Sequence, residues 1–293
     1  MTTSRFALAA GVMLGALSPL PAQQPTTPPA VLRIVREDIR EGKEAAHQKS
    51  ENTFMMEAAR AKYPANILGL TSITGTSQAW FLESHDSFEA IGATLAAFDK
   101  PDADFAKIDE LDAEFRSSSR SWIAIYRPDL SYHGQDLMQG LPKARFFNIS
   151  MVRVANGHGQ DFTELGRMAV DAATKTIDQQ PLAVYQVVSG LPEGTFMLFE
   201  PTDSLKMLDS AQDRSQAMLQ AMGDSGSKRF LKLAGDAIAS EESLLFSVSP
   251  KMSYVSKEFA AGDPAFWNPP AEETKAPPVK PRAKVPPKTA AAK

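Results

Sequence analysis

Apolar residues gather in short runs separated by longer stretches of mixed polarity, and the same order of runs occurs twice along the chain. The first half, residues 30–132, has strand-like runs at about 31–39, 67–74, 78–83 and 122–126. The second half, residues 145–255, has them at about 146–154, 182–189, 195–200 and 243–248. Helical stretches are predicted at about 43–62, 87–120, 160–177 and 204–242, with breaks near Pro101 and Gly223–Gly226. Each half therefore reads strand, helix, strand, strand, helix, strand.

Sequence matches at nearly constant spacing support an internal repeat. Gly42 and Gly157, 115 positions apart, each follow a strand-like run and precede a helix. Three further matches keep this order with loop-sized drift: Thr74-Gly75 with Ser189-Gly190, Trp80–Phe88 with Met197–Leu205, and Pro128–Tyr132 with Pro250–Tyr254. Four ordered matches predict two copies of one βαββαβ unit, which is the ferredoxin-like order.

The third strand of each half is apolar on both sides. Residues 80–82 read Trp-Phe-Leu and residues 196–199 read Phe-Met-Leu-Phe, so both faces of the strand need cover. Helices cover one face, and the sheet of the other half is the natural cover for the second. We therefore predict an α+β fold of two tandem ferredoxin-like repeats whose antiparallel sheets pack face to face.

This organisation resembles the dimeric α+β barrel superfamily in a fused, tandem form. The resemblance rests on the strand-end glycines Gly42 and Gly157, and on the strand-glutamate-loop-Asp-Ser-helix segments Glu83–Phe88 and Glu200–Leu205. It implies an intramolecular barrel, and hence a monomer with an internal pseudo-dimer. The superfamily includes cofactor-independent monooxygenases, haem-handling enzymes and isomerases, so it implies no single chemistry. No segment with an obvious proximal histidine is present; no cofactor is predicted, and haem stays open.

The two ends of the chain differ from the repeats. Arg5 followed by an apolar run and Pro21-Ala22 is typical of a secretory signal peptide, which predicts export to the periplasm or beyond. The predicted organisation is a signal peptide (1–22), a Pro-rich linker (23–29), a first repeat (30–132), a linker (133–144), a second repeat (145–255) and a disordered Pro/Lys/Ala-rich tail (256–293).

Composition and charge narrow the function classes. The chain has no cysteine, so an apolar core alone must hold an exported fold together, and 43% hydrophobic residues suffice for that. The formal net charge is −4, yet six basic residues and no acid follow position 274, so the folded body is more acidic than the whole. An acidic body argues against nucleic-acid binding. The basic tail has two interpretations, contact with anionic envelope polymers or simple solvation.

The candidate catalytic residues are His47, Glu83 and His85. His47 falls on Phe162 at the repeat offset, so a titratable ring occupies an apolar-face position of the first helix. Glu83 ends a strand with His85 close by, and a carboxylate beside an imidazole can transfer protons if both reach one cavity. The structural alternatives are a packed imidazole with one hydrogen bond and a carboxylate that orders a loop. Asp86-Ser87 is better explained as a helix N-cap.

The candidate ligand-binding residues are Arg36, His47, Trp80 and Glu200. Arg36 aligns with Met151, so the halves differ in polarity where a barrel interior is expected. No metal-ligand spacing, phosphate loop or nucleophile elbow is present in the sequence, and no metal site is predicted. Three functions remain open: a binder of a small apolar ligand or envelope component, an enzyme of the cofactor-independent monooxygenase or haem-handling kind, and a protein–protein interaction module.

Overall fold

The computed structural model describes residues 26–100, 103–176 and 180–268. The predicted signal peptide and the tail from residue 269 lie outside these ranges. Within them, no helix combines the length and the apolar character that a membrane crossing requires.

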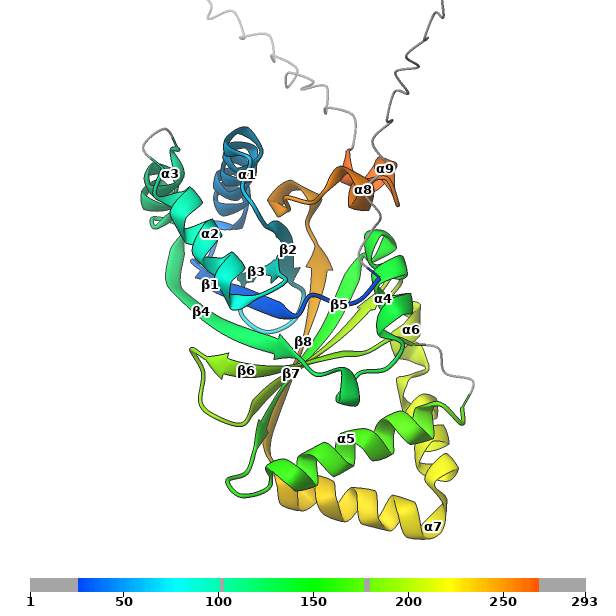
Figure 1. Ribbon diagram of the computed structural model, residues 1–293. Coiled ribbons are helices and arrows are strands. Elements are labelled where there is room, and N and C mark those ends of the chain that lie inside the picture. Colours follow the sequence, from blue (N-terminus) through cyan, green and yellow to red (C-terminus); the bar gives the residue numbers. More distant parts are fainter. Residues whose placement is uncertain (1–25, 101–102, 177–179, 269–293) are drawn as a thin grey trace, which may run out of the picture.

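Eight antiparallel strands form one closed barrel in the described chain (Figure 1). The strands are β1 (Val31–Ile39), β2 (Asn66–Ser72), β3 (Gln78–His85), β4 (Arg116–Tyr126), β5 (Phe146–Val154), β6 (Ala183–Ser189), β7 (Thr195–Thr202) and β8 (Ile238–Val248). Their order around the barrel is β1-β3-β2-β8-β5-β7-β6-β4. Each half thus contributes four strands in the same internal order, β4-β1-β3-β2 and β8-β5-β7-β6, which is the ferredoxin-like arrangement.

The halves are joined at both edges of their sheets. β2 pairs with β8 and β4 pairs with β6, both antiparallel. After its last strand, each half makes a 3-10 turn, residues 128–130 and 250–252. The serine that follows each turn accepts a hydrogen bond from the other half: Ser253 Oγ from the amide of Gly69, and Ser131 Oγ from the amide of Val184. We predicted two sheets that pack face to face. In the structure they also pair at both edges, so the eight strands form a single closed barrel.

Side chains from both halves fill the barrel interior. Trp80 is fully buried and lies 5.4 Å from Trp122 and 4.9 Å from Phe246, measured between ring centroids. Ile34, Ile149 and Met197 complete the layer and belong to the same apolar cluster. This shared core covers the inner face of the third strand of each half. Burial of its large aromatic side chains makes the core the main apolar contribution to stability.

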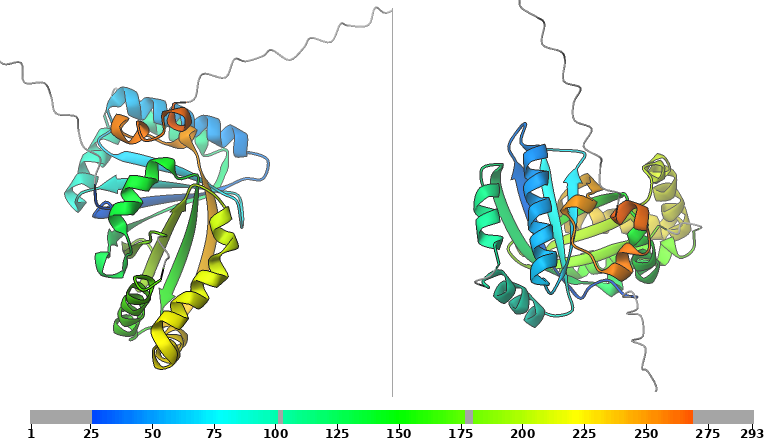
Figure 2. Two further views of the ribbon diagram at one scale, coloured as in Figure 1. Left: turned by 90° about the vertical axis from the view of Figure 1, so that its right-hand side faces the viewer. Right: turned by 90° about the horizontal axis from the view of Figure 1, so that it is seen from above.

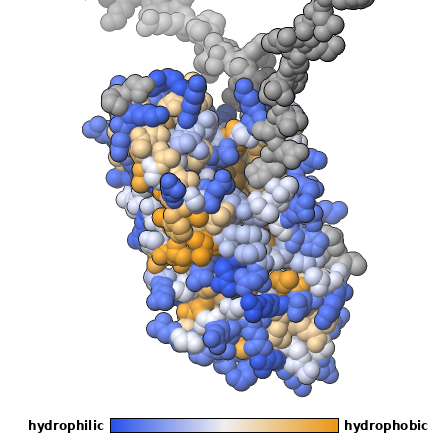
Figure 3. All heavy atoms as spheres, in the orientation of Figure 1, coloured by the Kyte–Doolittle hydropathy of each residue, from blue (hydrophilic) through white to orange (hydrophobic). Residues whose placement is uncertain are grey.

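Helices cover the outside of the barrel in two groups, on opposite sides in Figure 1. The first half supplies α1 (Glu44–Ala61), α2 (Phe88–Phe98) and α3 (Phe105–Asp112). The second half supplies α5 (Gly159–Ala173), α6 (Lys206–Asp209) and α7 (Ala211–Ala237). The predicted break in the last helix is confirmed, because Gly223 has φ 69° inside α7. The predicted N-cap is confirmed too, since Ser87 accepts a hydrogen bond from the amide of Ala90. The face in Figure 3 is mostly polar, with apolar side chains gathered over α2.

Two sequence-based boundaries need correction. The last strand of each half begins earlier than predicted, at Arg116 and Ile238, and the helical region before it is shorter. These early residues read Arg-Ser-Ser-Ser-Arg and Ile-Ala-Ser-Glu-Glu, which lack the apolar pattern of a strand, yet they pair with β1 and β5. Pairing with a neighbouring strand overrides weak local preference.

The segment after the second repeat is also partly ordered. Residues 256–268 were predicted to begin a disordered tail but form α8 (Lys257–Ala260) and α9 (Pro264–Trp267), seen in Figure 2. They pack on the predicted linker, which forms α4 (Gly134–Gly140) and a 3-10 turn, residues 141–143. Trp267 Nε1 donates to the carbonyl of Pro142 at 2.7 Å, and Arg145 lies over the Phe266 ring. Aromatic residues explain the order of this segment.

Candidate functional site

Strand β1 turns alternate side chains to two different environments. Leu32 and Ile34 face the barrel interior and belong to its core. Arg33, Val35 and Glu37 face outward, under the helices of the first half, and line a cavity there. Period-two alternation of a strand therefore places charged groups in the layer between sheet and helices.

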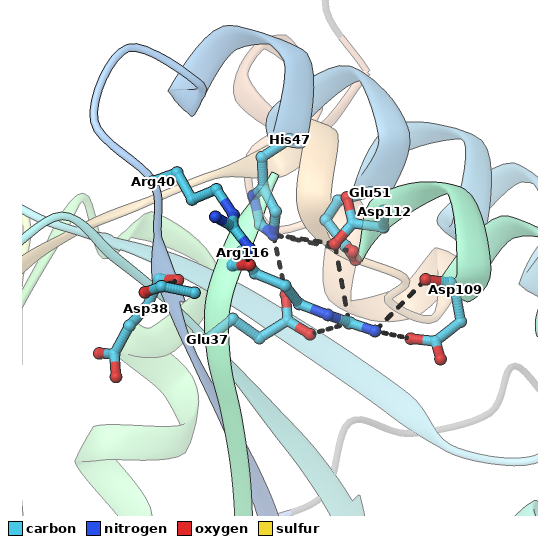
Figure 4. A network of polar contacts seen from close by, with 9 residues as sticks. Glu37, Asp38, Arg40, His47, Glu51, Asp109, Asp112 and Arg116 are labelled. Atoms are coloured by element: carbon cyan, nitrogen blue, oxygen red, sulfur yellow. Dashed lines mark hydrogen bonds and ion pairs between the residues drawn. The ribbon is translucent and has the colours of Figure 1, made fainter. Parts of the chain in front are cut away.

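Four potential metal-ligating side chains converge in that layer: Glu37 from β1, His47 and Glu51 from α1, and Asp112 from the end of α3 (Figure 4). We call these four residues the acidic centre. All four are buried, with exposed fractions of 7% or less. His47 and Glu51 are four positions apart and so share one face of α1.

The Nε2 atom of His47 is the hub of the acidic centre. It lies 2.8 Å from Glu37 Oε2, 3.5 Å from Asp112 Oδ2 and 3.9 Å from Glu51 Oε1. Arg116, at the start of β4, approaches from the other side, with Nη1 2.5 Å from Glu37 Oε1 and Nη2 2.6 Å from Asp109 Oδ1. The cluster thus contains three buried carboxylates, one imidazole and one guanidinium.

The carboxyl groups of Asp112 and Glu51 are electrostatically strained. Neither oxygen of Asp112 has a hydrogen-bond partner among the described residues, although the side chain is 1% exposed. Burial raises the pKa of Asp112 despite the opposing charge of His47. Burial, followed by the charges of Glu37 and Asp112, raises the pKa of Glu51 well above its usual range. Perturbed pKa values in a cluster beside a cavity are typical of functional sites.

A cavity of about 300 Å³ lies between the first-half sheet and its helices. Glu37 and Glu51 belong both to its wall and to the acidic centre, so the centre can be reached from the cavity. Phe54, Phe81 and Phe98 give the wall an aromatic part. A second group of polar residues completes the lining: Arg33, which lies four positions before Glu37 on β1, together with Tyr63, Glu83 and Thr94.

The predicted pair Glu83 and His85 is in contact, and its geometry indicates an anchoring role. His85 Nε2 lies 2.6 Å from Glu83 Oε1, and Glu83 also accepts hydrogen bonds from Tyr63, Arg33 and Thr94. Burial raises the pKa of Glu83, but the His85 hydrogen bond and the Arg33 charge outweigh it and hold the pKa below its ordinary range. A saturated, firmly ionised carboxylate is a poor general base. Glu83 orients Tyr63 and Arg33 at the cavity wall instead.

The remaining predicted residues lie elsewhere. Arg36 is on the barrel-facing side of β1 and donates two hydrogen bonds to Asp38. Trp80 is part of the barrel core, and its Nε1 donates to Gln78. Glu200 accepts a hydrogen bond from Asn148 and lines a different cavity in the second half. Of the predicted ligand-binding set, the structure places only His47 in the acidic centre.

The corresponding layer of the second half has apolar residues at the positions that match the acidic centre. At the repeat offsets, Glu37, His47 and Glu51 correspond to Val152, Phe162 and Gly166. Arg116 corresponds to Ile238, since both pair at the bulge that ends the first strand of their half. Val152, Phe162, Gly166 and Ile238 line a cavity of about 270 Å³. Sequence comparison between the halves identified the mismatches at Arg36 and His47 and missed those at Glu37 and Glu51, which lie at the same offset.

A third, smaller cavity of about 130 Å³ occupies one end of the barrel interior. Its wall is almost entirely apolar, with Leu32, Leu82 and Phe199 from the strands. Leu137 of α4 and Phe259 of α8 close it from outside. This cavity offers shape and apolar surface but few polar groups.

No described histidine is placed to hold a haem iron. Haem iron takes an axial histidine, cysteinate, tyrosinate or methionine in a cavity large enough for the porphyrin. No histidine lines any of the three cavities. His47 and His85 direct their Nε2 atoms at carboxylates, and the hydroxyl of Tyr63 donates to Glu83. No haem chemistry is derived for this chain.

Comparison with known proteins gives a fold and no family. No family model matches the chain, and no curated protein matches it. A solved structure described as an anthrone oxidase-like protein has 11% identity, covers 75% of this chain and 91% of its own, and gives a TM-score of 0.50.

Two further solved structures are less similar. A monooxygenase candidate from Lactobacillus acidophilus has 8% identity over 77% of this chain and 94% of its own, with a TM-score of 0.44. Chlorite dismutase from Candidatus Nitrospira defluvii, solved with imidazole, has 9% identity over 76% and 92%, with a TM-score of 0.45. At these identities the likeness concerns the fold alone. The chain has an α+β barrel fold of the ferredoxin-like kind.

Proposed function

We propose that the protein binds a small, largely apolar organic molecule in the first-half cavity. The observation that carries this proposal is a cavity of about 300 Å³ with aromatic walls and a polar group near each end. Such a volume is at the lower end of the range for small-molecule sites, which are mostly apolar with a few convergent polar groups. Both arginines of the wall already pair with carboxylates there, so the polar groups favour a ligand with a neutral hydroxyl or carbonyl oxygen.

The test compares cavity-filling variants of the two halves. Val35→Phe fills the first-half cavity, and Ala173→Phe fills the second-half cavity as a matched control. Small neutral aromatic molecules such as phenol and 1-naphthol serve as probes in calorimetry. We expect binding to wild type, at least tenfold weaker binding to V35F, and unchanged binding to A173F. No binding to wild type, or equal loss in both variants, would contradict the proposal.

A second candidate function is catalysis at the same cavity, in the manner of a cofactor-independent monooxygenase. It is favoured by Glu51, whose raised pKa at the cavity wall suits a group that exchanges a proton with a ligand. Glu51→Gln is expected to abolish turnover of a bound ligand, followed as oxygen uptake, while ligand affinity changes less than threefold. Oxygen uptake that persists in E51Q would exclude Glu51 from this role.

We also infer that the chain is exported and folds as a monomer built by tandem duplication. The signal-like residues 1–22 support export. The matched turns after the last strand of each half, whose serines accept hydrogen bonds from the other half, support duplication. Expression with and without residues 1–22, followed by cell fractionation, tests export. Light scattering is expected to give one copy per particle; a stable dimer would contradict the monomer.

The basic end of the chain is proposed to contact anionic envelope polymers. It carries six basic residues and no acid from Lys275 to Lys293. Deleting these residues is expected to shift the protein from the envelope-bound to the soluble fraction. An unchanged distribution would exclude anchoring.

A further inference from the structure

The potential ligand atoms of the acidic centre are nearly as close together as the ligands of one metal ion. One atom from each of Glu37, His47, Glu51 and Asp112 lies within 4.8 Å of every other. Nitrogen and oxygen ligands lie about 2.0–2.2 Å from a transition-metal ion, so two of them are at most about 4.4 Å apart. An inward movement of a few tenths of an ångström is enough to reach that spacing.

A second observation, independent of this clustering, is the Asp112 carboxylate. Both its oxygens are buried without a hydrogen-bond partner in the described ranges, while it lies 3.5 Å from His47 Nε2 and 3.7 Å from Arg116 Nη1. Buried polar groups almost always have a hydrogen-bond partner, and a buried carboxylate held only by ion pairs of 3.5 Å or longer is costly. Figure 4 shows the Asp112 carboxylate directed toward His47 and Arg116, where a cation would give it a closer partner.

Charge balance gives the same answer. The three carboxylates of the acidic centre and that of Asp109 gather around one guanidinium, that of Arg116. A divalent cation adds positive charge where carboxylates outnumber cationic groups. The fold itself does not require the charges, because the second half replaces Glu37 and His47 with Val152 and Phe162.

We propose that the acidic centre binds one divalent transition-metal ion through His47 Nε2 and one carboxylate oxygen each from Glu37, Glu51 and Asp112. One imidazole and three carboxylates favour Mn²⁺, Fe²⁺ or Zn²⁺ over Mg²⁺ and Ca²⁺, which prefer oxygen ligands alone. Arg116 donates a hydrogen bond to Oε1 of Glu37 and so holds this side chain in place. This metal-site proposal goes beyond the organic-ligand proposal and does not depend on it.

The direct test uses wild-type protein treated with a chelator and then dialysed. Calorimetric titration with MnCl₂, and separately with ZnCl₂, is expected to give one ion per chain and at least tenfold weaker binding of MgCl₂. Because a cation that binds only the folded state stabilises it, Tm is expected to rise by about 5 °C or more at a hundredfold excess over Kd. No binding, or binding far below one ion per chain, overturns the proposal.

Variants place the ion in the acidic centre. Asp112→Asn and Glu51→Gln keep side-chain size and are expected to weaken Mn²⁺ binding by at least tenfold. His158→Ala is the matched control, since His158 forms a surface pair with Asp161 in the second half. Circular dichroism checks that each variant is folded, and the Mn²⁺ paramagnetic resonance spectrum of wild type gives an independent readout. Unchanged affinity in both D112N and E51Q, or equal loss in H158A, overturns the assignment.

The metal proposal and the organic-ligand proposal fail separately. V35F is expected to keep its Mn²⁺ affinity within threefold, because Val35 is outside the acidic centre. Loss of Mn²⁺ binding in V35F would contradict the assignment of ligands, whereas loss of phenol binding alone concerns only the cavity.

Discussion

The sheet–helix layers of the two halves share a backbone plan and differ in chemistry. In the first half, the layer holds the acidic centre and Arg116 beside a cavity with charged walls. In the second, Val152, Phe162 and Ile238 occupy matching positions around a mostly apolar cavity of similar volume. An α+β barrel can therefore be covered by either kind of layer. The cation that we propose accounts for the buried charges of the first half.

The largest predicted effect comes from breaking the charge balance of the first layer. Arg116→Met leaves Glu37 and Asp112 buried without their cation and is expected to destabilise the metal-free protein by about 3–5 kcal/mol in urea unfolding. The variant E37V/H47F/E51A/D112A/R116I copies the apolar layer and is expected to stay within about 1 kcal/mol of wild type or exceed it. If both variants lose stability equally, the halves are not interchangeable.

The reverse change in the second layer is expected to cost somewhat less. Phe162→His places an imidazole where its neighbours are apolar, such as Phe196 at 4.5 Å between ring centroids. Lost aromatic packing and an unpaired polar group predict a loss of about 2–4 kcal/mol. Urea unfolding measures it, with Phe162→Leu as the control for packing alone. A cost equal to that of F162L would show that the second layer tolerates polar groups.

Glu83 and Glu200 compare a saturated with a lightly bonded carboxylate at equivalent strand ends. Glu83→Gln is expected to cost about 2 kcal/mol at neutral pH, and Glu200→Gln less than about 1 kcal/mol. Because the folded-state pKa of Glu83 is lowered, its contribution is present above the unfolded-state pKa and is lost as pH falls through the folded-state value. The E83Q penalty, measured from pH 7 to pH 3, is expected to shrink below about pH 4.5. A constant penalty would exclude ionisation as its cause.

The smallest predicted effect concerns a feature that the halves share. Gly42 has φ 75° and Gly157 has φ 86°, and nothing lies within 4 Å of a Cβ atom built at either position. Gly→Ala at each is expected to cost about 1 kcal/mol, from backbone strain alone. Thermal unfolding of G42A and G157A should give equal shifts. Unequal shifts would show that the two turns are under different constraints.

The sequence predicted the order of strands and helices along the chain and the helix break at Gly223 because both depend on local pattern. It identified His47 because Phe162 stands at the matching position. It missed Asp112 and Arg116, since the predicted helix over 87–120 hid the turn between α3 and β4 where both residues lie. It missed Glu37 because a strand residue reveals its partners only when the helices that cover it are placed. His47 and Asp112 are 65 positions apart in the sequence and meet only because the chain packs in this way. No rule of sequence spacing predicts such a contact.

Closure of the barrel through β2–β8 and β4–β6 bears on what either half would do alone. A fragment of residues 30–132 would present β2 and β4 as two open edges with unpaired backbone groups. The same fragment retains every residue of the acidic centre. Two copies would therefore complete each other's edges and form a symmetric pair with two charged layers in place of one. A single chain with two different halves can carry one charged and one mostly apolar layer, which a homodimer of identical chains cannot do.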